Sequence, residues 1–139
     1  MRGVVISTDV LVIGSGAGGL SAAVTAAAHG LKVVVAERAP LVGGSSCWSG
    51  GWLWLPRNRH ARQGGIDEPA EAPRRYLEEV LGDRFDAARV DAFLAAAPEL
   101  VDFFEANSAL RFEPGNHICD IYGERPGAGT GFRSLIAAP

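Results

Sequence analysis

The sequence has little sulfur and little net charge. Its 139 residues include two cysteines and one methionine, and the formal net charge is −3. Cys47 and Cys119 are too few and too isolated for a disulfide framework, and no Cys-x-x-Cys spacing indicates a metal site. We therefore expect no bound metal and, by default, a reducing, cytoplasmic location.

Long apolar runs and strongly basic patches are also lacking. The first apolar run, residues 10–13, stops at a glycine and is too short for a signal peptide or a membrane span. The small net charge gives no electrostatic footprint for nucleic acid. The one arginine cluster, residues 57–62, has no interleaved aromatics and is typical of a solvated loop. We expect a soluble protein that neither spans a membrane nor binds nucleic acid.

Glycine is abundant, with 18 residues, and the first of these glycines punctuate a strand, helix, strand pattern. Residues 9–13 are short and rich in β-branched side chains, which predicts a buried strand of a parallel sheet. The alanine-rich stretch 18–29 predicts a helix that ends at Gly30, and residues 31–37 predict a second strand. The short connections favour a right-handed βαβ unit with parallel strands.

The texture changes after Pro56. Residues 57–65 are polar and predict a loop, and residues 67–83 predict a helix with Asp67 or a neighbour as its cap. A helix is also expected from Asp86 to residue 97, and a separate one from Pro98 to residue 108. From Asn107 onward, prolines and glycines predict turns and irregular structure.

A phosphate-binding pattern lies where the first strand gives way to the helix. Gly14, Gly16 and Gly19 fit Gly-x-Gly-x-x-Gly, with roles in the tight turn, the approach of a pyrophosphate and close helix–strand packing. The helix N-terminus offers free N–H groups to phosphates. Glu37 ends the second strand, where a carboxylate accepts hydrogen bonds from adenosine ribose hydroxyls and repels the 2′-phosphate of NADP. A dinucleotide site is therefore predicted.

The βαβ unit alone does not separate FAD from NAD. An NAD-binding domain would normally enter its next helix after the second strand, whereas this chain continues with "VGGSSCWSGGWLWLP". Its two glycine pairs, at 43–44 and 50–51, stand beside small hydroxyl residues, and such loops bring backbone amides close to phosphates and ring edges. This favours FAD, with an NAD-dependent dehydrogenase as the alternative.

The stretch resembles the FAD-binding start of the fumarate reductase and succinate dehydrogenase flavoprotein superfamily. Within that superfamily, "SCWSGGWLWLPRN" is most similar to the 3-ketosteroid dehydrogenase-like flavoproteins. The resemblance is strong over residues 9–58 and weaker beyond them. It implies FAD as cofactor and hydride transfer between the flavin and an organic substrate, by dehydrogenation beside a carbonyl or the reverse. It also implies a small substrate, steroid-like or a 2-enoyl or keto compound.

The resemblance carries cofactor-binding roles over to four groups of residues. They are the phosphate loop of Gly14, Ser15, Gly16, Ala17, Gly18 and Gly19; the adenosine end of Glu37 and Arg38; the second loop of Gly43, Gly44, Ser45 and Ser46; and the stretch beside the flavin ring, Ser49, Gly50 and Gly51. For Trp48, Trp52 and Trp54, packing around these loops is favoured over stacking on the flavin.

The catalytic residues are not identified by the resemblance. Ketosteroid dehydrogenases place a tyrosine directly after an aspartate in the later region, but this chain reads "CDIYGERPG". Ile121 follows Asp120, and Tyr122 comes one place later, which makes Tyr122 a weak catalytic candidate beside its reading as a packed loop residue. His29, His60 and His117 match no family position and are interpreted as structural or solvent-facing.

The length of 139 residues limits the fold that the chain can form. We expect an α/β chain with a Rossmann-like FAD-binding βαβ unit and cofactor loops over residues 5–56. A mainly helical segment and the start of a substrate-binding region are expected over 57–139. A parallel sheet of so few strands lacks the layers that cover both faces, so the chain is interpreted as an N-terminal fragment of a larger flavoenzyme whose C-terminal part is missing. The second alternative is a non-catalytic dinucleotide-binding fragment.

Overall fold

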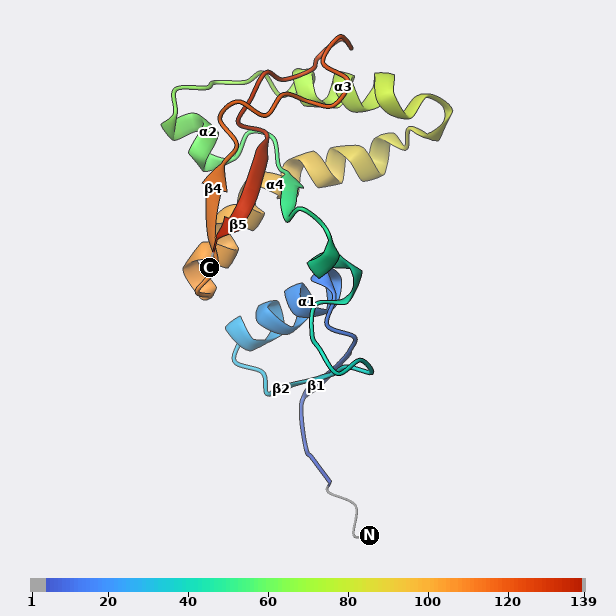
Figure 1. Cartoon of the computed structure of the whole chain (residues 1–139), viewed down its shortest axis with the longest axis vertical. Helices are drawn as coiled ribbons and strands as arrows, with labels where there is room; N and C mark the ends of the chain where they lie inside the picture. The colour runs from blue at the N-terminus through green and yellow to red at the C-terminus, as the bar shows by residue number, and fades with distance from the viewer. Residues whose placement is uncertain (1–4, 139) are drawn as a thin grey trace. The chain divides into compact units, whose positions relative to one another are not determined.

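The computed structural model describes residues 5–138, and the chain divides into two compact units, residues 1–51 and 52–139. Figure 1 shows the helices and strands of both units. Pro139, the last residue of the second expected segment, lies outside the described residues. Strand β3, residues Trp52–Trp54, pairs within the second unit.

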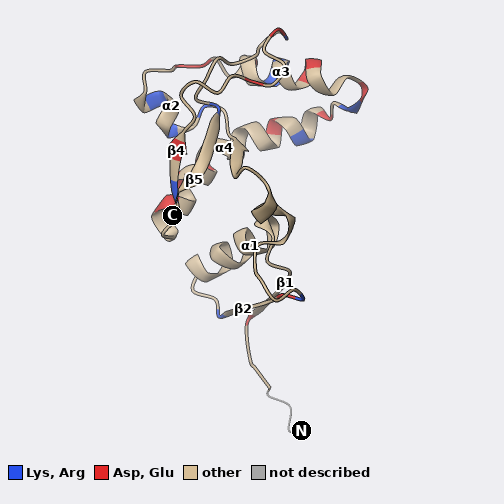
Figure 2. Cartoon of the chain, viewed as in Figure 1, with Lys and Arg blue, Asp and Glu red and all other residues tan. Residues whose placement is uncertain are grey.

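The first unit is the expected βαβ unit. Strand β1 (Val10–Ile13) is followed by helix α1 (Ala17–Ala28) and strand β2 (Val33–Ala36), and β1 and β2 pair in parallel with Val10 opposite Val33. The predicted α/β class with a Rossmann-like unit is therefore confirmed. Helix α1 carries no charged side chain, as Figure 2 shows.

Gly30 ends α1 as predicted. Its φ is +80°, a left-handed conformation that glycine adopts without a steric cost. The N–H of Gly30 donates to the carbonyl of Ala27, and the N–H of Leu31 donates to that of Ala26. This is the Schellman pattern, which satisfies the last carbonyls of the helix.

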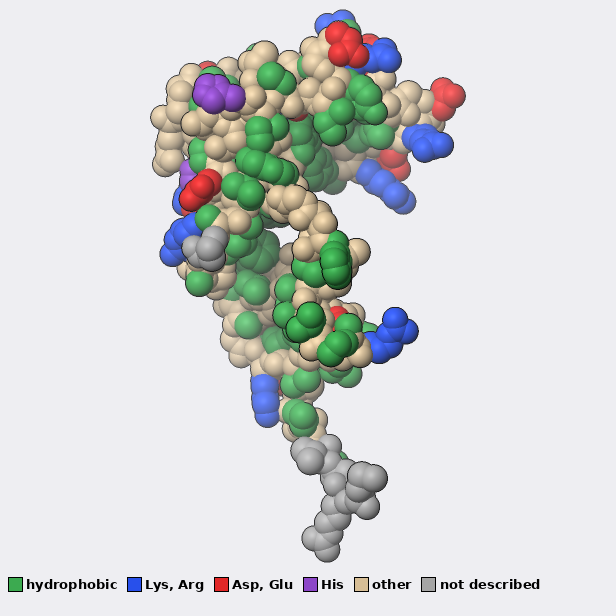
Figure 3. All heavy atoms as spheres, in the orientation of Figure 1, with side chains coloured by type: hydrophobic (Ala, Val, Ile, Leu, Met, Phe, Trp, Pro, Cys, Tyr) green, Lys and Arg blue, Asp and Glu red, His purple; other side chains and the backbone are tan. Residues whose placement is uncertain are grey.

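The strand predicted at residues 9–13 is present as β1, but the prediction that it is buried was wrong. Val12 is 8% exposed, but Leu11 is 57% and Ile13 76% exposed. Alternate side chains of a strand point to opposite faces, and in this unit α1 lies against the face that carries Val12. Leu11 and Ile13 therefore remain on the other face, and hydrophobic side chains at the surface are visible in Figure 3.

The second unit combines helices with a small antiparallel sheet. Its helices are α2 (Arg59–Gln63), α3 (Glu71–Leu81) and α4 (Ala87–Asn107), and the short 3₁₀ helix η2 (Gly82–Arg84) follows α3. Strand β5 (Ser134–Ala138) lies between β3 and β4 (Arg111–Pro114). The core joins sheet and helix through Leu55, Ala97, Val101, Phe112 and Leu135.

Four local expectations for this unit were wrong. Residues 107–138 are not wholly irregular, because β4 and β5 pair there with Phe112 opposite Ala137. The loop at 57–65 contains α2, which Asn58 caps by accepting from the N–H of Ala61 at 3.0 Å. Helix α3 begins after Ala70, so Asp67 does not cap it.

The fourth difference is at Pro98, which lies inside α4 and does not begin a new helix. Proline lacks an N–H and usually breaks a helix. Here Ala97 and Val101 are 2% and 0% exposed on the core face of the same helix, so their burial accounts for its continuation. The helix expected from Asp86 is confirmed, and Asp86 is its N-cap, since its carboxylate accepts from the N–H of Arg89.

Within residues 5–138, none of the helices is long and apolar enough to cross a membrane.

Candidate functional site

The first glycine loop joins β1 to α1 and makes a close strand–helix contact. Gly14 has a φ of +93°, which favours glycine, and its N–H donates to the carbonyl of Ala36 at the end of β2. A Cβ at Gly19 would lie 2.1 Å from the carbonyl oxygen of Gly14. Glycine at position 19 is therefore required for the helix to pack against the strand.

At Gly16 and Gly18, no steric contact within the protein requires glycine. Gly16 has φ −70° and ψ 178°, a conformation open to any residue, and a Cβ there would meet nothing within 4 Å. The same open space surrounds Gly18 in the first turn of α1. The first N–H groups of a helix lack intrahelical partners, so the loop presents backbone donors beside unfilled space.

Glu37 follows β2 and is held by the first glycine loop. Its Oε2 accepts from the N–H of Ser15 at 2.9 Å and from the Ser15 hydroxyl at 2.6 Å, and its Oε1 accepts from the N–H of Ala39 at 2.8 Å. These hydrogen bonds, first that of Ala39 and then those of Ser15, lower the pKa of Glu37 to about 2. The carboxylate is thus ionised at neutral pH.

The second glycine loop approaches the first. Gly43 and Gly44 have φ values of +117° and +56° and begin the 3₁₀ helix η1 (Gly44–Trp48). A Cβ at Gly44 would lie 3.1 Å from the Cα of Gly16, so a larger residue would push the two loops apart. Ser46 accepts from the N–H of Ala17 at 3.2 Å, which places its hydroxyl at the N-terminus of α1.

The other predicted cofactor residues lie on the same unit. Ser49 donates to the carbonyl of Ser46 at 2.8 Å and accepts from the N–H of Gly51 at 3.1 Å. Arg38, Ser45, Ser49 and Gly50 are exposed, and Gly51 is half-buried. The structure therefore brings Ser15, Glu37, Gly43 and the N-terminus of α1 together.

The second unit contains an apolar cavity of about 550 Å³. Trp52, Trp54, Leu77 and Val80 form part of its wall. Tyr122, the catalytic candidate, also lines it and is 48% exposed. The backbone N–H of Tyr122 donates to the hydroxyl of Tyr76, another lining residue, at 3.3 Å. The cavity thus pairs a hydrophobic wall with two phenol groups.

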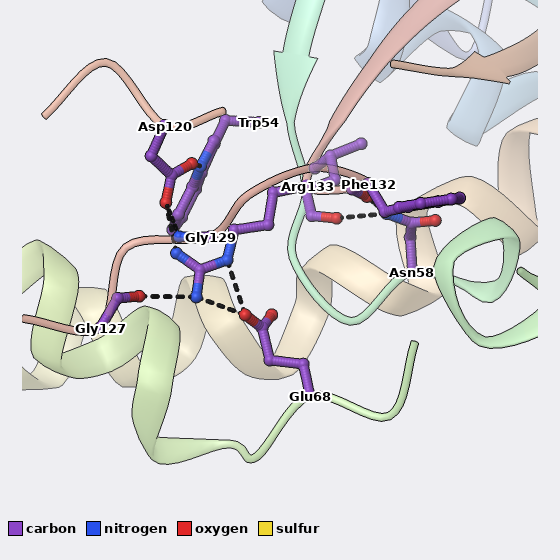
Figure 4. A network of polar contacts seen from close by, with 9 residues as sticks. Trp54, Asn58, Glu68, Asp120, Gly127, Gly129, Phe132 and Arg133 are labelled. Atoms are coloured by element: carbon purple, nitrogen blue, oxygen red, sulfur yellow. Dashed lines mark hydrogen bonds and ion pairs between the residues drawn. The ribbon is translucent and has the colours of Figure 1, made fainter. Parts of the chain in front are cut away.

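A buried polar network borders this cavity, as Figure 4 shows. Arg133 pairs with both Asp120 and Glu68 and donates to the carbonyl of Gly127 at 2.7 Å. Its guanidinium lies 5.6 Å from the centre of the Trp54 ring, within cation–π range. The sequence does not predict this network, because no spacing rule links residues 68, 120 and 133.

Asn58 anchors the chain near Arg133. It is 0% exposed, and its amide donates to the carbonyls of Leu55 at 2.7 Å and Phe132 at 2.8 Å. Phe132 has a φ of +64°, which is unusual for a bulky residue. The hydrogen bond from Asn58 supports that conformation, and Arg133 follows directly.

The family model described as "FAD binding domain" matches residues 9–136. The chain belongs to the FAD binding domain family. FAD is therefore its cofactor, as the glycine pairs at 43–44 and 50–51 predicted.

Two relatives of this FAD binding domain are dehydrogenases. It is 41% identical over 133 residues to 3-oxosteroid 1-dehydrogenase of Mycobacterium tuberculosis (strain ATCC 25618 / H37Rv), covering 94% of this chain and 23% of that protein. It is 39% identical over 131 residues to 4-oxocyclohex-2-ene-1-carboxylate 5-dehydrogenase of Sinomonas cyclohexanicum, covering 94% and 22%.

A solved structure of a dehydrogenase is also similar to this chain. The crystal structure of 3-ketosteroid delta1-dehydrogenase from Sterolibacterium denitrificans, in complex with 1,4-androstadiene-3,17-dione, matches with a TM-score of 0.85 and 34% identity. The match covers 94% of this chain and 23% of that one. The FAD binding domain described here therefore spans less than a quarter of the length of these relatives.

Proposed function

We propose that the first unit holds the ADP part of FAD in the two glycine loops. In this proposal the backbone of residues 14–19 and the hydroxyl of Ser46 face the pyrophosphate, and Glu37 with Arg38 faces the adenosine. Gly43, Gly44 and Ser45 complete the second loop, and Ser49, Gly50 and Gly51 run beside the flavin ring. The observation that carries the proposal is Gly16, where a Cβ would meet open space and the backbone conformation does not call for glycine, so that room is left for a ligand.

The charge of the loops also suits a pyrophosphate. The N-terminus of α1 carries a partial positive charge and has no acidic residue in its first turn. The ionised Glu37 stands at the end of β2, where its repulsion of a 2′-phosphate favours an unmodified adenosine ribose. The residues present therefore fit FAD.

For the whole protein we propose a FAD-dependent oxidoreductase that dehydrogenates a small organic ketone beside its carbonyl group. When bound, FAD supplies the acceptor for a hydride. The names of the relatives and the apolar cavity of the second unit support a steroid-like or other alicyclic ketone, since such rings bury in apolar pockets. The rest of the enzyme would come from polypeptide corresponding to the uncovered length of the relatives.

Tyr122 is the residue of this chain that we propose to contact the polar group of the substrate. Tyr122 is among the residues that line the apolar cavity, and in this proposal its phenol exchanges a proton or hydrogen-bonds with a substrate carbonyl. Ile121, at the position where ketosteroid dehydrogenases have tyrosine, is 90% exposed and offers no such group. A cytoplasmic location is also proposed, since Cys47 and Cys119 are both free and exposed.

Gly16→Val tests the cofactor site. The added side chain occupies open space, so the fold is expected to be retained, while the pyrophosphate is blocked. The measurement is the visible flavin spectrum of the protein after incubation with FAD and desalting, with circular dichroism to verify the fold. Ala28→Val, at the exposed far end of α1, is the matched control and retains FAD. Equal flavin in both variants would contradict the proposal.

A further inference from the structure

Ser15 is the residue at which three segments of the first unit meet. It is 1% exposed, and its hydroxyl oxygen accepts from the N–H of Gly43 at 2.9 Å. The same hydroxyl donates to Oε2 of Glu37 at 2.6 Å. A backbone amide can only donate and a carboxylate can only accept, so the direction of both hydrogen bonds is fixed. Ser15 therefore links the second glycine loop to Glu37 through one oriented hydroxyl.

The carboxylate of Glu37 is held by hydrogen bonds at both of its oxygens. An ionised carboxylate offers about four lone-pair sites. Among the described residues, Ser15 uses two on Oε2 and Ala39 uses one on Oε1. Of these three hydrogen bonds Oε1 accepts one and Oε2 two, and the direction of Oε1 is set because the carboxylate is held at both oxygens.

We propose that Ser15 is a positioning residue of the FAD site, which holds Glu37 so that Oε1 accepts a hydrogen bond from a ribose hydroxyl of the cofactor. This inference rests on the proposed binding of the adenosine at Glu37. The Ser15 hydroxyl does not touch FAD itself, because it is buried and is engaged by Gly43 and Glu37. Its effect on the cofactor passes through the orientation of the carboxylate.

The structure also indicates why a hydroxyl is needed. Alanine at position 15 would leave the Gly43 N–H without its acceptor and remove one of the two donors to Oε2. A donor left without a partner and a charged hydrogen bond lost are both unfavourable. The carboxylate would then be held by backbone N–H groups alone and would lose its link to the second glycine loop.

The first test uses the protein without flavin and follows the Glu37 carboxyl by ¹³C NMR during a pH titration. In Ser15→Ala the titration midpoint is expected to move upward by about one pH unit, because a donor to the charged form is lost. The matched control Ser21→Ala, on the second turn of α1, leaves the midpoint unchanged. An unchanged midpoint in Ser15→Ala would overturn the inference.

A second measurement does not require Ser15→Ala to fold. Glu37→Gln removes the charge that orients the Ser15 hydroxyl but leaves Ser15 in place. The amide resonance of Gly43 is expected to shift together with those of Ser15 and Ala39. If the Gly43 resonance stays in place while the other two move, the link through Ser15 does not exist.

Cofactor binding gives the third readout. Ser15→Ala is expected to lower the affinity for FAD about tenfold. For an FAD analogue with 2′,3′-dideoxyadenosine, which lacks the ribose hydroxyls, the same substitution is expected to change the affinity little. Equal weakening for both ligands would mean that Ser15 acts on the loop as a whole and would overturn the positioning role. If the unaltered protein binds neither ligand, the proposed function fails, while the Glu37 titration still decides the role of Ser15.

Discussion

The indole N–H of Trp54 donates to Oδ1 of Asp120 at 2.7 Å, across 66 positions of the chain. The other carboxylate oxygen pairs with Arg133 and accepts from the N–H of Gly129 at 2.8 Å. The side chains of Asp120 and Arg133 are 1% and 4% exposed. This carboxylate therefore connects strand β3 to the segment that lines the apolar cavity.

Removal of the charge partner of Asp120 is expected to destabilise the second unit. Arg133→Met leaves a buried carboxylate without its counter-charge, which costs about 3–5 kcal/mol. Urea unfolding followed by tryptophan fluorescence measures the change. Arg89→Met is the control, because the Arg89 side chain is 88% exposed in its pair with Asp86, and such pairs contribute about 0–1 kcal/mol. Similar losses of unfolding free energy in both variants would contradict the expectation that the buried ion pair contributes more than the exposed one.

Gly18 and Gly19 are neighbours in α1 with opposite expected responses to alanine. Gly19→Ala places a Cβ against the carbonyl of Gly14, and the resulting overpacking destabilises the fold by about 1–3 kcal/mol or more. Gly18→Ala meets open space and, as a substitution in a helix, is expected to stabilise it by up to about 1 kcal/mol. Thermal unfolding of the two variants compares them directly. Destabilisation by both would show that the strand–helix contact is not specific to Gly19.

The low pKa of Glu37 predicts a dependence of stability on acid. The folded-state pKa of about 2 lies below that of an unfolded glutamate, so the unfolded chain binds the proton more readily. The stabilisation is complete above about pH 5 and is lost as the pH falls toward 2. The difference in unfolding free energy between the unaltered protein and Glu37→Gln is therefore expected to shrink over that range. A constant difference would contradict the lowered pKa.

His60 predicts a second pH dependence, nearer neutrality. Its Nε2 lies 3.1 Å from Oε1 of Glu105, and burial followed by the charge of Arg59 lowers the pKa of His60, against a smaller opposing effect of Asp102. The unfolded state therefore takes up the proton first, and stability should fall as the pH drops through about 6.5. Urea unfolding between pH 5 and 8 measures this. His60→Gln should flatten the profile, whereas His117→Gln, at an exposed position, should not.

The sequence predicted the first unit well because its signals are local. The glycines of the loop, the alanine-rich helix, Gly30 and Glu37 all lie within one strand–helix–strand segment, and each has a position fixed by the neighbouring element. The contact between Ser15 and Gly43 was not predicted, because serine in a glycine loop has no pattern that shows which group its hydroxyl faces.

The second unit was harder to predict because its pairings are distant. Strand β3 has three residues, and residues 111–114 include glutamate and proline, which are uncommon in strands. Their hydrogen-bonding partner is β5, and pairing across many residues leaves no mark in a short window of sequence. Pro98 shows the reverse case, in which a strong local signal for a helix boundary gives way to tertiary packing of Ala97 and Val101.

The pairing of β3 with β5 has a consequence for synthesis on the ribosome. The β1–α1–β2 unit can form as soon as its own residues have emerged, since both strands lie within residues 10–36. Trp52 must instead wait for Ile136, its partner in β5. Because chains emerge N-terminus first, at about 5–20 residues per second, the central strand of the second unit arrives several seconds after β3. During that interval β3 is without its partner, so a pause in translation between residues 55 and 133 would prolong the exposure of Trp52 and Leu53 to chaperones and proteases.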